Sequence, residues 1–200
     1  LGPRGAPRAA VATVDASGHF RSSFSLDKPG KWLVQVLATT STGPRPALEA
    51  YVFAGEAPPT RFTAQPAPGE EAEKGPGDAT AAMRRMMDAA RATEGLPPLT
   101  PDKTLDRLAR EHAERMIAAK TLGHDVGGGD PATRIRDAGF RSAIAGENVS
   151  VAATVTSAHR ALWSSPSHRG NLLDGRFKRA GTAVLKSDDG RSWVAVLFTD

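Results

Sequence analysis

The chain has 200 residues with 26 Lys or Arg and 22 Asp or Glu, so its formal net charge at pH 7 is +4. The absence of cysteine excludes disulfide scaffolds, cysteine nucleophiles and zinc–thiolate sites. The charges form no basic block, which argues against nucleic-acid binding. No apolar run approaches the roughly 20 residues that cross a bilayer, so we expect no transmembrane segment.

Four segments with alternating apolar residues predict β-strands in the N-terminal part. They are residues 9–14, 20–26, 31–38 and 47–53. We interpret residues 1–57 as a small antiparallel β-sandwich domain, Ig-like and incomplete, because four strands of this length make only a thin core. We expect further strands upstream of Leu1, where any signal peptide would also lie.

Glycine and proline are frequent between residues 54 and 77, where Phe62 is the only large apolar residue. Such a segment cannot bury enough surface to offset its ordering entropy. We therefore expect residues 58–77 to be an extended linker and the two flanking domains to move independently.

The apolar period changes to that of a helix from residue 78 onward. Amphipathic helices are predicted over residues 79–90, 102–117, 130–139 and 155–163, with a further turn from Ser165, and strands over 181–185 and 192–198. The first three helices begin at aspartates that are suitable N-caps. Helices that flank a small antiparallel sheet define residues 78–200 as an α+β domain.

Two histidines and one glutamate are the candidate functional residues. His124 and His168 lie beside small residues at element boundaries, where sites often collect, and Glu147 lies in an apolar segment with no basic neighbour along the sequence. Two imidazoles and a carboxylate suffice to hold a divalent ion with an open coordination position. By contrast, His112 lies on the apolar stripe of a helix and is interpreted as a core residue, and His159 as a packing or surface residue.

A series of short motifs runs in order along residues 78–200. They are Glu94-Gly-Leu-Pro-Pro-Leu99, Gly123-His124, Arg134, Ala138-Gly-Phe140, Gly146-Glu-Asn-Val149, Trp163-Ser-Ser-Pro-Ser-His168 and Asn171-Leu-Leu173. In these motifs the chain resembles the CAP superfamily of cysteine-rich secretory proteins, antigen 5 and plant pathogenesis-related proteins. The similarity is to the cysteine-free bacterial branch (SCP-like domains), and it does not extend to residues 1–57.

The resemblance implies an α-β-α sandwich with a central cleft that carries two histidines and two acidic residues. His124 and His168 match the histidines, and Glu147 matches the glutamate of the Gly-Glu-Asn motif. The second acidic residue of the family usually stands three positions after the conserved tryptophan, where this sequence has Pro166. The expected metal ligands are therefore His124, Glu147 and His168, and the expected cofactor is Zn²⁺ or another divalent cation.

Three functions remain open at this point. The resemblance favours a secreted or cell-envelope protein that acts as an extracellular binding module, with a metal, a small molecule, a lipid or a protein as its ligand. The alternative is a metal-dependent peptidase or esterase, in which Glu147 is the candidate catalytic base beside a zinc-bound water. The third is a purely structural module of the cell envelope.

Overall fold

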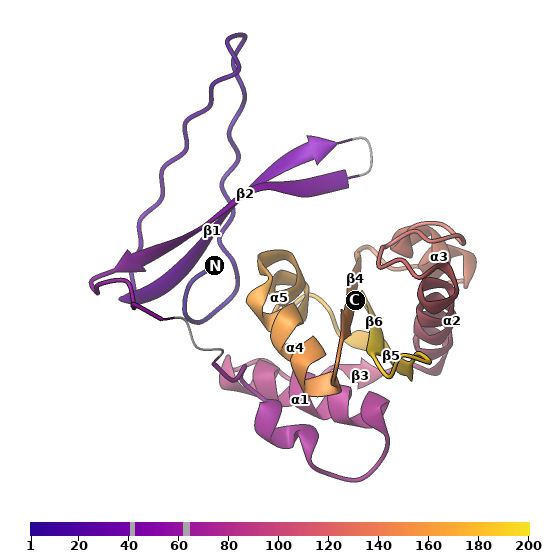
Figure 1. The fold of residues 1–200 in the computed structure, drawn as a ribbon. Coiled ribbons are helices and arrows are strands. Elements are labelled where there is room, and N and C mark those ends of the chain that lie inside the picture. Colours follow the sequence, from indigo (N-terminus) through magenta and orange to yellow (C-terminus); the bar gives the residue numbers. More distant parts are fainter. Residues whose placement is uncertain (41–42, 62–64) are drawn as a thin grey trace. The chain divides into compact units, whose positions relative to one another are not determined.

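The computed structural model describes residues 1–40, 43–61 and 65–200. The chain divides into two compact units, Leu1–Ala64 and Gln65–Asp200, which are described separately below (Figure 1).

The first unit contains one antiparallel pair of strands. β1 (Gly30–Thr40) pairs with β2 (Gly43–Ala54), with Trp32 opposite Val52 and a register shift after Val36. The strands predicted over residues 31–38 and 47–53 are therefore confirmed.

The strands predicted over residues 9–14 and 20–26 are wrong, and the expected β-sandwich is not confirmed. Neither segment pairs with a strand in the described residues, and the turn between them closes through the Gly18 amide, which donates to the Asp15 carbonyl at 3.0 Å. Apolar side chains there are exposed, Val11 by 97% and Phe24 by 52%. An alternating pattern becomes a strand only where a neighbouring strand completes its hydrogen bonds, and a lone two-stranded sheet is at best marginally stable.

The second unit is a three-layer α-β-α sandwich (Figure 1). Its sheet has the order β3-β5-β6-β4, in which β3 is parallel to β5 and the remaining pairs are antiparallel. The strands are β3 (Thr100–Pro101), β4 (Ala145–Ala152), β5 (Arg179–Lys186) and β6 (Ser192–Thr199). The helices are η1 (Glu70–Glu73), α1 (Ala79–Thr93), α2 (Lys103–Ala119), α3 (Pro131–Asp137), α4 (Val155–Ser164) and α5 (Pro166–Leu172).

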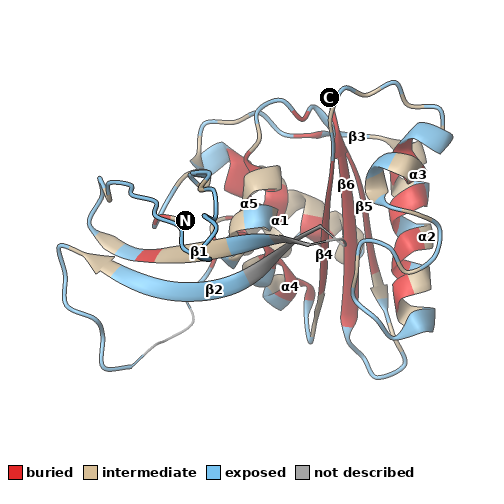
Figure 2. Cartoon of the chain, turned by 90° about the horizontal axis from the view of Figure 1, so that it is seen from above, coloured by how far each residue is buried: buried red, intermediate tan, exposed pale blue. Residues whose placement is uncertain are grey.

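Two hydrophobic cores lie on opposite faces of β6, which is buried along its whole length (Figure 2). Val194, Val196 and Phe198 face the core formed with α1, α4 and α5. The alternate residues Trp193, Ala195 and Leu197 face the core formed with α2 and α3. Because successive side chains of a strand point to opposite faces, one continuous apolar strand supplies both cores.

The predicted helix starts are confirmed. Asp78 accepts a hydrogen bond from the Ala81 amide, Asp102 accepts from the amides of Thr104 and Leu105, and Asp130 accepts from the Thr133 amide. Strand β4 was not predicted, since the sequence of this segment does not alternate, and neither were the short elements β3 and η1.

The predicted linker differs from the structure, which places Gln65 and the residues after it in the second unit. The Glu70 carboxylate pairs with the Arg160 guanidinium, with Oε1 2.7 Å from Nε, and the ring of buried His159 donates from Nε2 to the Pro68 carbonyl at 2.9 Å. Composition predicted no packing here because it counts apolar side chains, whereas this segment is held largely by polar contacts with α1 and α4, among them those of Arg85 with the carbonyls of Ala72 and Glu73. The predicted linker residues 62–64 lie outside the described residues.

Helix α2 packs closely on strand β5 at Gly181. A Cβ atom at this position would lie 2.0 Å from the backbone carbon of Leu105. We expect Gly181→Ala to lower the free energy of unfolding by at least about 2 kcal/mol, because a rigid helix backbone must move away. Gly175→Ala is the control, since its Cβ would meet Leu96 Cδ2 at an ordinary 3.7 Å. Urea unfolding of both variants measures the difference, and equal stabilities would contradict this packing.

Candidate functional site

The site is centred on the carboxylate of Glu147, which is 4% exposed and belongs to β4. Its Oε2 accepts a hydrogen bond from Arg134 Nη2 at 2.6 Å, and its Oε1 lies 2.8 Å from His124 Nδ1. Both carboxylate oxygens are therefore engaged. Glu147 has no basic neighbour along the sequence, but α3 brings Arg134 to it in space.

Arg134 connects three parts of the site. Its Nη2 also donates to the His124 carbonyl at 3.0 Å, and its Nε donates to the Gly129 carbonyl at 3.1 Å. The guanidinium, in a residue only 5% exposed, thus ties the segment that carries His124 to strand β4. In the sequence, only the motif series pointed to Arg134, and the motifs did not indicate that its partner is Glu147.

The His124 side chain is 52% exposed, unlike the carboxylate that it contacts. An ionised carboxylate only accepts hydrogen bonds, so we assign the proton of this contact to Nδ1. In the neutral ring, Nε2 then carries the free lone pair. Glu147 fixes the orientation of this imidazole in the way that carboxylates orient ligand histidines in many proteins.

His112 lies beneath His124 and is fully buried, as the sequence analysis expected of a core histidine. Its Nε2 donates to the Gly123 carbonyl at 2.9 Å and lies 3.7 Å from Glu147 Oε1. Burial lowers the pKa of His112, and this effect outweighs the opposing charge of Glu147. The neutral ring therefore supports the backbone next to His124, a role the sequence did not reveal.

His168 belongs to α5, which lies on the face of the sheet opposite to α2 and α3, and it is partly buried. Burial is the main cause that lowers its pKa to about 4, His124 adds to this lowering, and Glu147 opposes it. These electrostatic influences place His168 in the neighbourhood of the other two residues. At neutral pH its imidazole is uncharged.

Two asparagines hold α5 against β4. Asn148 Nδ2 donates to the His168 carbonyl at 2.9 Å, and Asn171 Nδ2 donates to Asn148 Oδ1 at 3.0 Å and to the Glu147 carbonyl at 3.1 Å. Asparagine side chains commonly form hydrogen bonds with the backbone, and these two do so here. They fix the backbone of His168 relative to the strand that carries Glu147.

The position of β4 in the sheet explains how both helical layers contribute to one site. β4 is an edge strand in the order β3-β5-β6-β4. Residues from the α2–α3 layer and from α5 can meet beside such a strand, because no further strand covers its outer side. Of the three predicted site residues, the structure joins His124 to Glu147 by a hydrogen bond and brings His168 within their electrostatic influence.

The predicted metal-ligand set includes Glu147, whose carboxylate already has two protein partners. Across residues 1–40, 43–61 and 65–200, no group of three or more His, Cys, Asp or Glu side chains is arranged to hold a metal ion. Arg134 and His124 each engage one oxygen of Glu147, so this carboxylate is placed to orient His124. Its roles as a metal ligand and as a general base stay predictions.

Comparison with protein families gives a match of residues 84–198 to the Cysteine-rich secretory protein family, CAP. The chain belongs to the CAP family. This match confirms the resemblance seen in the motifs and covers the site. No curated protein matches the chain.

Three solved bacterial structures are similar to the CAP unit. An outer surface protein from Borrelia burgdorferi is 24% identical with a TM-score of 0.58, over 61% of this chain and 92% of that one. An extracellular protein containing a SCP domain from Bacillus anthracis str. Ames is 23% identical with a TM-score of 0.54, over 60% and 40%. A cysteine-rich secretory protein from Staphylococcus aureus is 16% identical with a TM-score of 0.51, over 60% and 38%.

These similarities establish the CAP fold of the second unit. This chain spans less than half the length of the Bacillus and Staphylococcus chains. Within the part of the chain that the structure describes, none of the helices combines the length and the apolar character needed to cross a membrane.

The buried ion pair of the CAP site predicts a large, asymmetric effect of substitution. We expect Arg134→Met to lower the free energy of unfolding by about 3–5 kcal/mol, because it leaves the Glu147 carboxylate buried without a counter-charge. The double variant Arg134→Met/Glu147→Met should recover most of that loss. Arg136→Met is the control, since its pair with Asp137 is exposed and should contribute little. If Arg134→Met is no more destabilising than Arg136→Met in urea unfolding, the ion pair does not hold the site.

The lowered pKa of His168 predicts a pH dependence of stability. The folded state resists protonation of this ring down to a pH of about 4, whereas the unfolded chain takes up the proton near its ordinary pKa of 6.5. Because the unfolded state then binds more protons, the free energy of unfolding should fall as the pH drops from about 6.5 to about 4. The contribution of His168 is about 3 kcal/mol, at about 1.4 kcal/mol for each pKa unit.

Chemical unfolding at several pH values tests this dependence in the wild type and in His168→Gln. The variant should lose part of the pH dependence, and the remainder should persist, because burial also lowers the pKa values of His112 and His159. An unchanged slope in His168→Gln would refute the assignment.

Proposed function

We propose that the CAP unit is an extracellular binding module whose ligand contacts the imidazoles of His124 and His168. The observation that carries this proposal is the contact between His124 and Glu147, in which a buried carboxylate holds an exposed imidazole. A buried ion pair is a poor source of stability compared with apolar packing. It is well suited to hold one ring in a fixed orientation toward solvent.

The chemistry of the two rings defines the ligand class. A neutral His168 and a His124 whose Nδ1 is occupied by Glu147 together offer ring nitrogens as electron-pair donors or hydrogen-bond acceptors. Such a pair suits a divalent cation that completes its coordination with water, or a small molecule with hydrogen-bond donors. In either case Glu147 acts behind His124 as a positioning residue, supported by Arg134.

The extracellular part of the proposal rests on the relatives. One similar structure is an outer surface protein and another is an extracellular protein. Since this chain shares their fold at low identity, we infer the same side of the membrane for it and propose a secreted or cell-envelope location. No observation favours the hydrolase alternative over a binding module.

Calorimetric titration of the full chain with Zn²⁺ tests the proposal directly. We expect saturable binding that weakens at least tenfold in His124→Ala and in His168→Ala, because each variant removes one of the two nitrogen donors. His19→Ala is the matched control, since His19 is an exposed histidine of the first unit. Glu147→Gln should weaken binding less than either histidine variant, in keeping with an indirect role.

Vesicles of phosphatidylglycerol, with and without sterol, test a lipid ligand with the same variants. Binding of Zn²⁺ or of vesicles that is insensitive to both histidine substitutions would contradict the proposed ligand contacts of His124 and His168. The absence of saturable binding to every one of these probes would contradict the binding function itself.

A further inference from the structure

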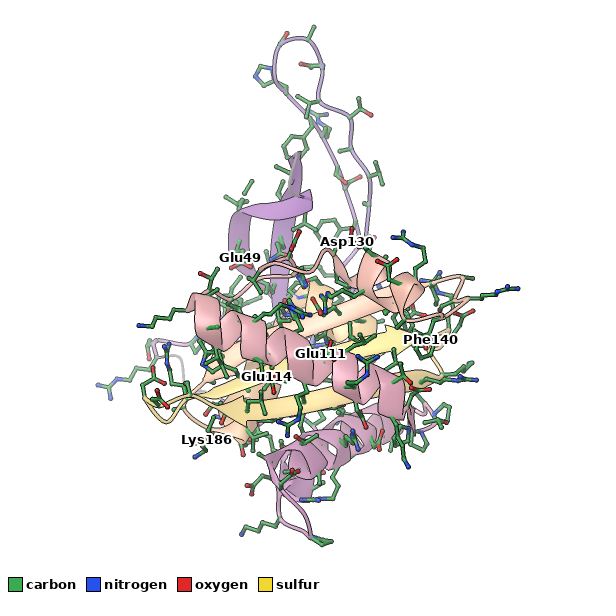
Figure 3. The ribbon with its side chains drawn as sticks, turned by 90° about the vertical axis from the view of Figure 1, so that its right-hand side faces the viewer. Glu49, Glu111, Glu114, Asp130, Phe140 and Lys186 are labelled. Atoms are coloured by element: carbon green, nitrogen blue, oxygen red, sulfur yellow. The ribbon has the colours of Figure 1, made fainter. Side chains whose placement is uncertain are left out.

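Arg134 also lines a pocket of the CAP unit. This pocket has a volume of about 260 Å³ and lies between α2, α3 and the glycine loop of residues 127–129. Figure 3 faces this side of the unit, with α2 in front of the sheet, Glu111 labelled on that helix and Asp130 at the start of α3. The polar side chains that line it are Arg107, Glu111, Arg115, Arg134 and Asp137.

Two arginine nitrogens at this pocket are buried without a hydrogen-bond partner. They are Arg134 Nη1 and Arg115 Nε. Every other guanidinium nitrogen of Arg134 donates to a carboxylate or carbonyl, so the free Nη1 stands out in a residue that is only 5% exposed. Leaving a charged donor buried and unpaired is costly, and such groups in native proteins usually have a water or an ion as partner.

The same glycine loop brings the two guanidinium groups together. Arg134 Nε donates to the Gly129 carbonyl, and a Cβ atom on Gly128 would lie 3.1 Å from Cζ of Arg115. Gly128 also has a positive φ of 110°, which an L side chain rarely adopts. The backbone at Gly128 can therefore approach Arg115 closely only because this residue has no side chain.

The charges around the pocket favour an anion over a cation. Both acidic side chains of the lining are already paired, Glu111 with Arg107 at 2.6 Å and Asp137 with Arg136 at 3.1 Å. Arg115 has no carboxylate within ion-pair distance among the described residues. Two guanidinium groups thus offer unused donors in a space that suits a small molecule.

We propose that this pocket binds the oxyanion of a small molecule, a carboxylate or a phosphate, through the guanidinium groups of Arg115 and Arg134. The lining of this pocket does not include His124, Glu147 or His168. Binding of the oxyanion does not depend on the proposed function of His124 and His168.

The test titrates the full chain with inorganic phosphate and with acetate, with chloride keeping the ionic strength constant. NMR of the arginine Nε–Hε resonances reports binding, and that of Arg115 should shift in a saturable manner. Arg115→Gln should weaken the affinity at least tenfold. Arg110→Gln is the matched control, because it removes the same charge from the exposed side of the same helix and should leave binding unchanged.

Each outcome supports or overturns the proposal. Saturation by phosphate alone assigns a phosphoryl ligand, and saturation by acetate alone assigns a carboxylate. Arg115→Lys keeps the positive charge but lacks Nε, so weak binding by a folded Arg115→Lys protein supports the directed hydrogen bond. The absence of saturable shifts, or equal weakening in Arg110→Gln and Arg115→Gln, overturns the site and leaves water as the partner of these donors.

Discussion

The buried ion pair between Arg134 and Glu147 is the contact on which the arrangement of the CAP site depends. A carboxylate that is 4% exposed requires a counter-charge, and a guanidinium with bonds to two backbone carbonyls as well as the carboxylate supplies it. In meeting this requirement, Arg134 fixes the segment that carries His124. The orientation of the exposed His124 imidazole therefore depends on how the buried charge of Glu147 is compensated.

The same requirement changes how the histidine–glutamate–histidine set is understood. The motif suggests three equivalent metal ligands. In the structure the carboxylate differs from the two imidazoles, because it contacts Arg134 and orients His124. Glu147 faces Arg134 with one oxygen and His124 with the other, so it links the ion pair to the orientation of the imidazole. His168 approaches from the other helical layer, which is possible because β4 is the edge of the sheet. Arg134 also lines a pocket together with Arg115.

The two units differ in how many of their apolar side chains they bury. In the CAP unit, β6 supplies alternate side chains to two cores, and Gly181 lets the backbone of α2 pack closely on β5. In the first unit, Trp32 is the one buried apolar side chain among those described, and its indole donates to the Lys28 carbonyl at 3.0 Å. The alternating segments around Val11 and Phe24 have the composition of strands but no neighbouring strand to pair with among the described residues.

The sequence by itself determined the local features of this protein. Asp78, Asp102 and Asp130 cap their helices because capping acts within three residues, and the apolar stripes predict helices because their period is local. The ordered motifs indicated the family and singled out His124, Glu147 and His168. Only the tertiary structure decided that Arg134 pairs with Glu147, that His112 supports the backbone at Gly123, and that residues after Gln65 pack on α1 and α4. The physical reason is that charges and ladder hydrogen bonds are satisfied by partners close in space, and no periodicity of the chain encodes which distant residue that partner is.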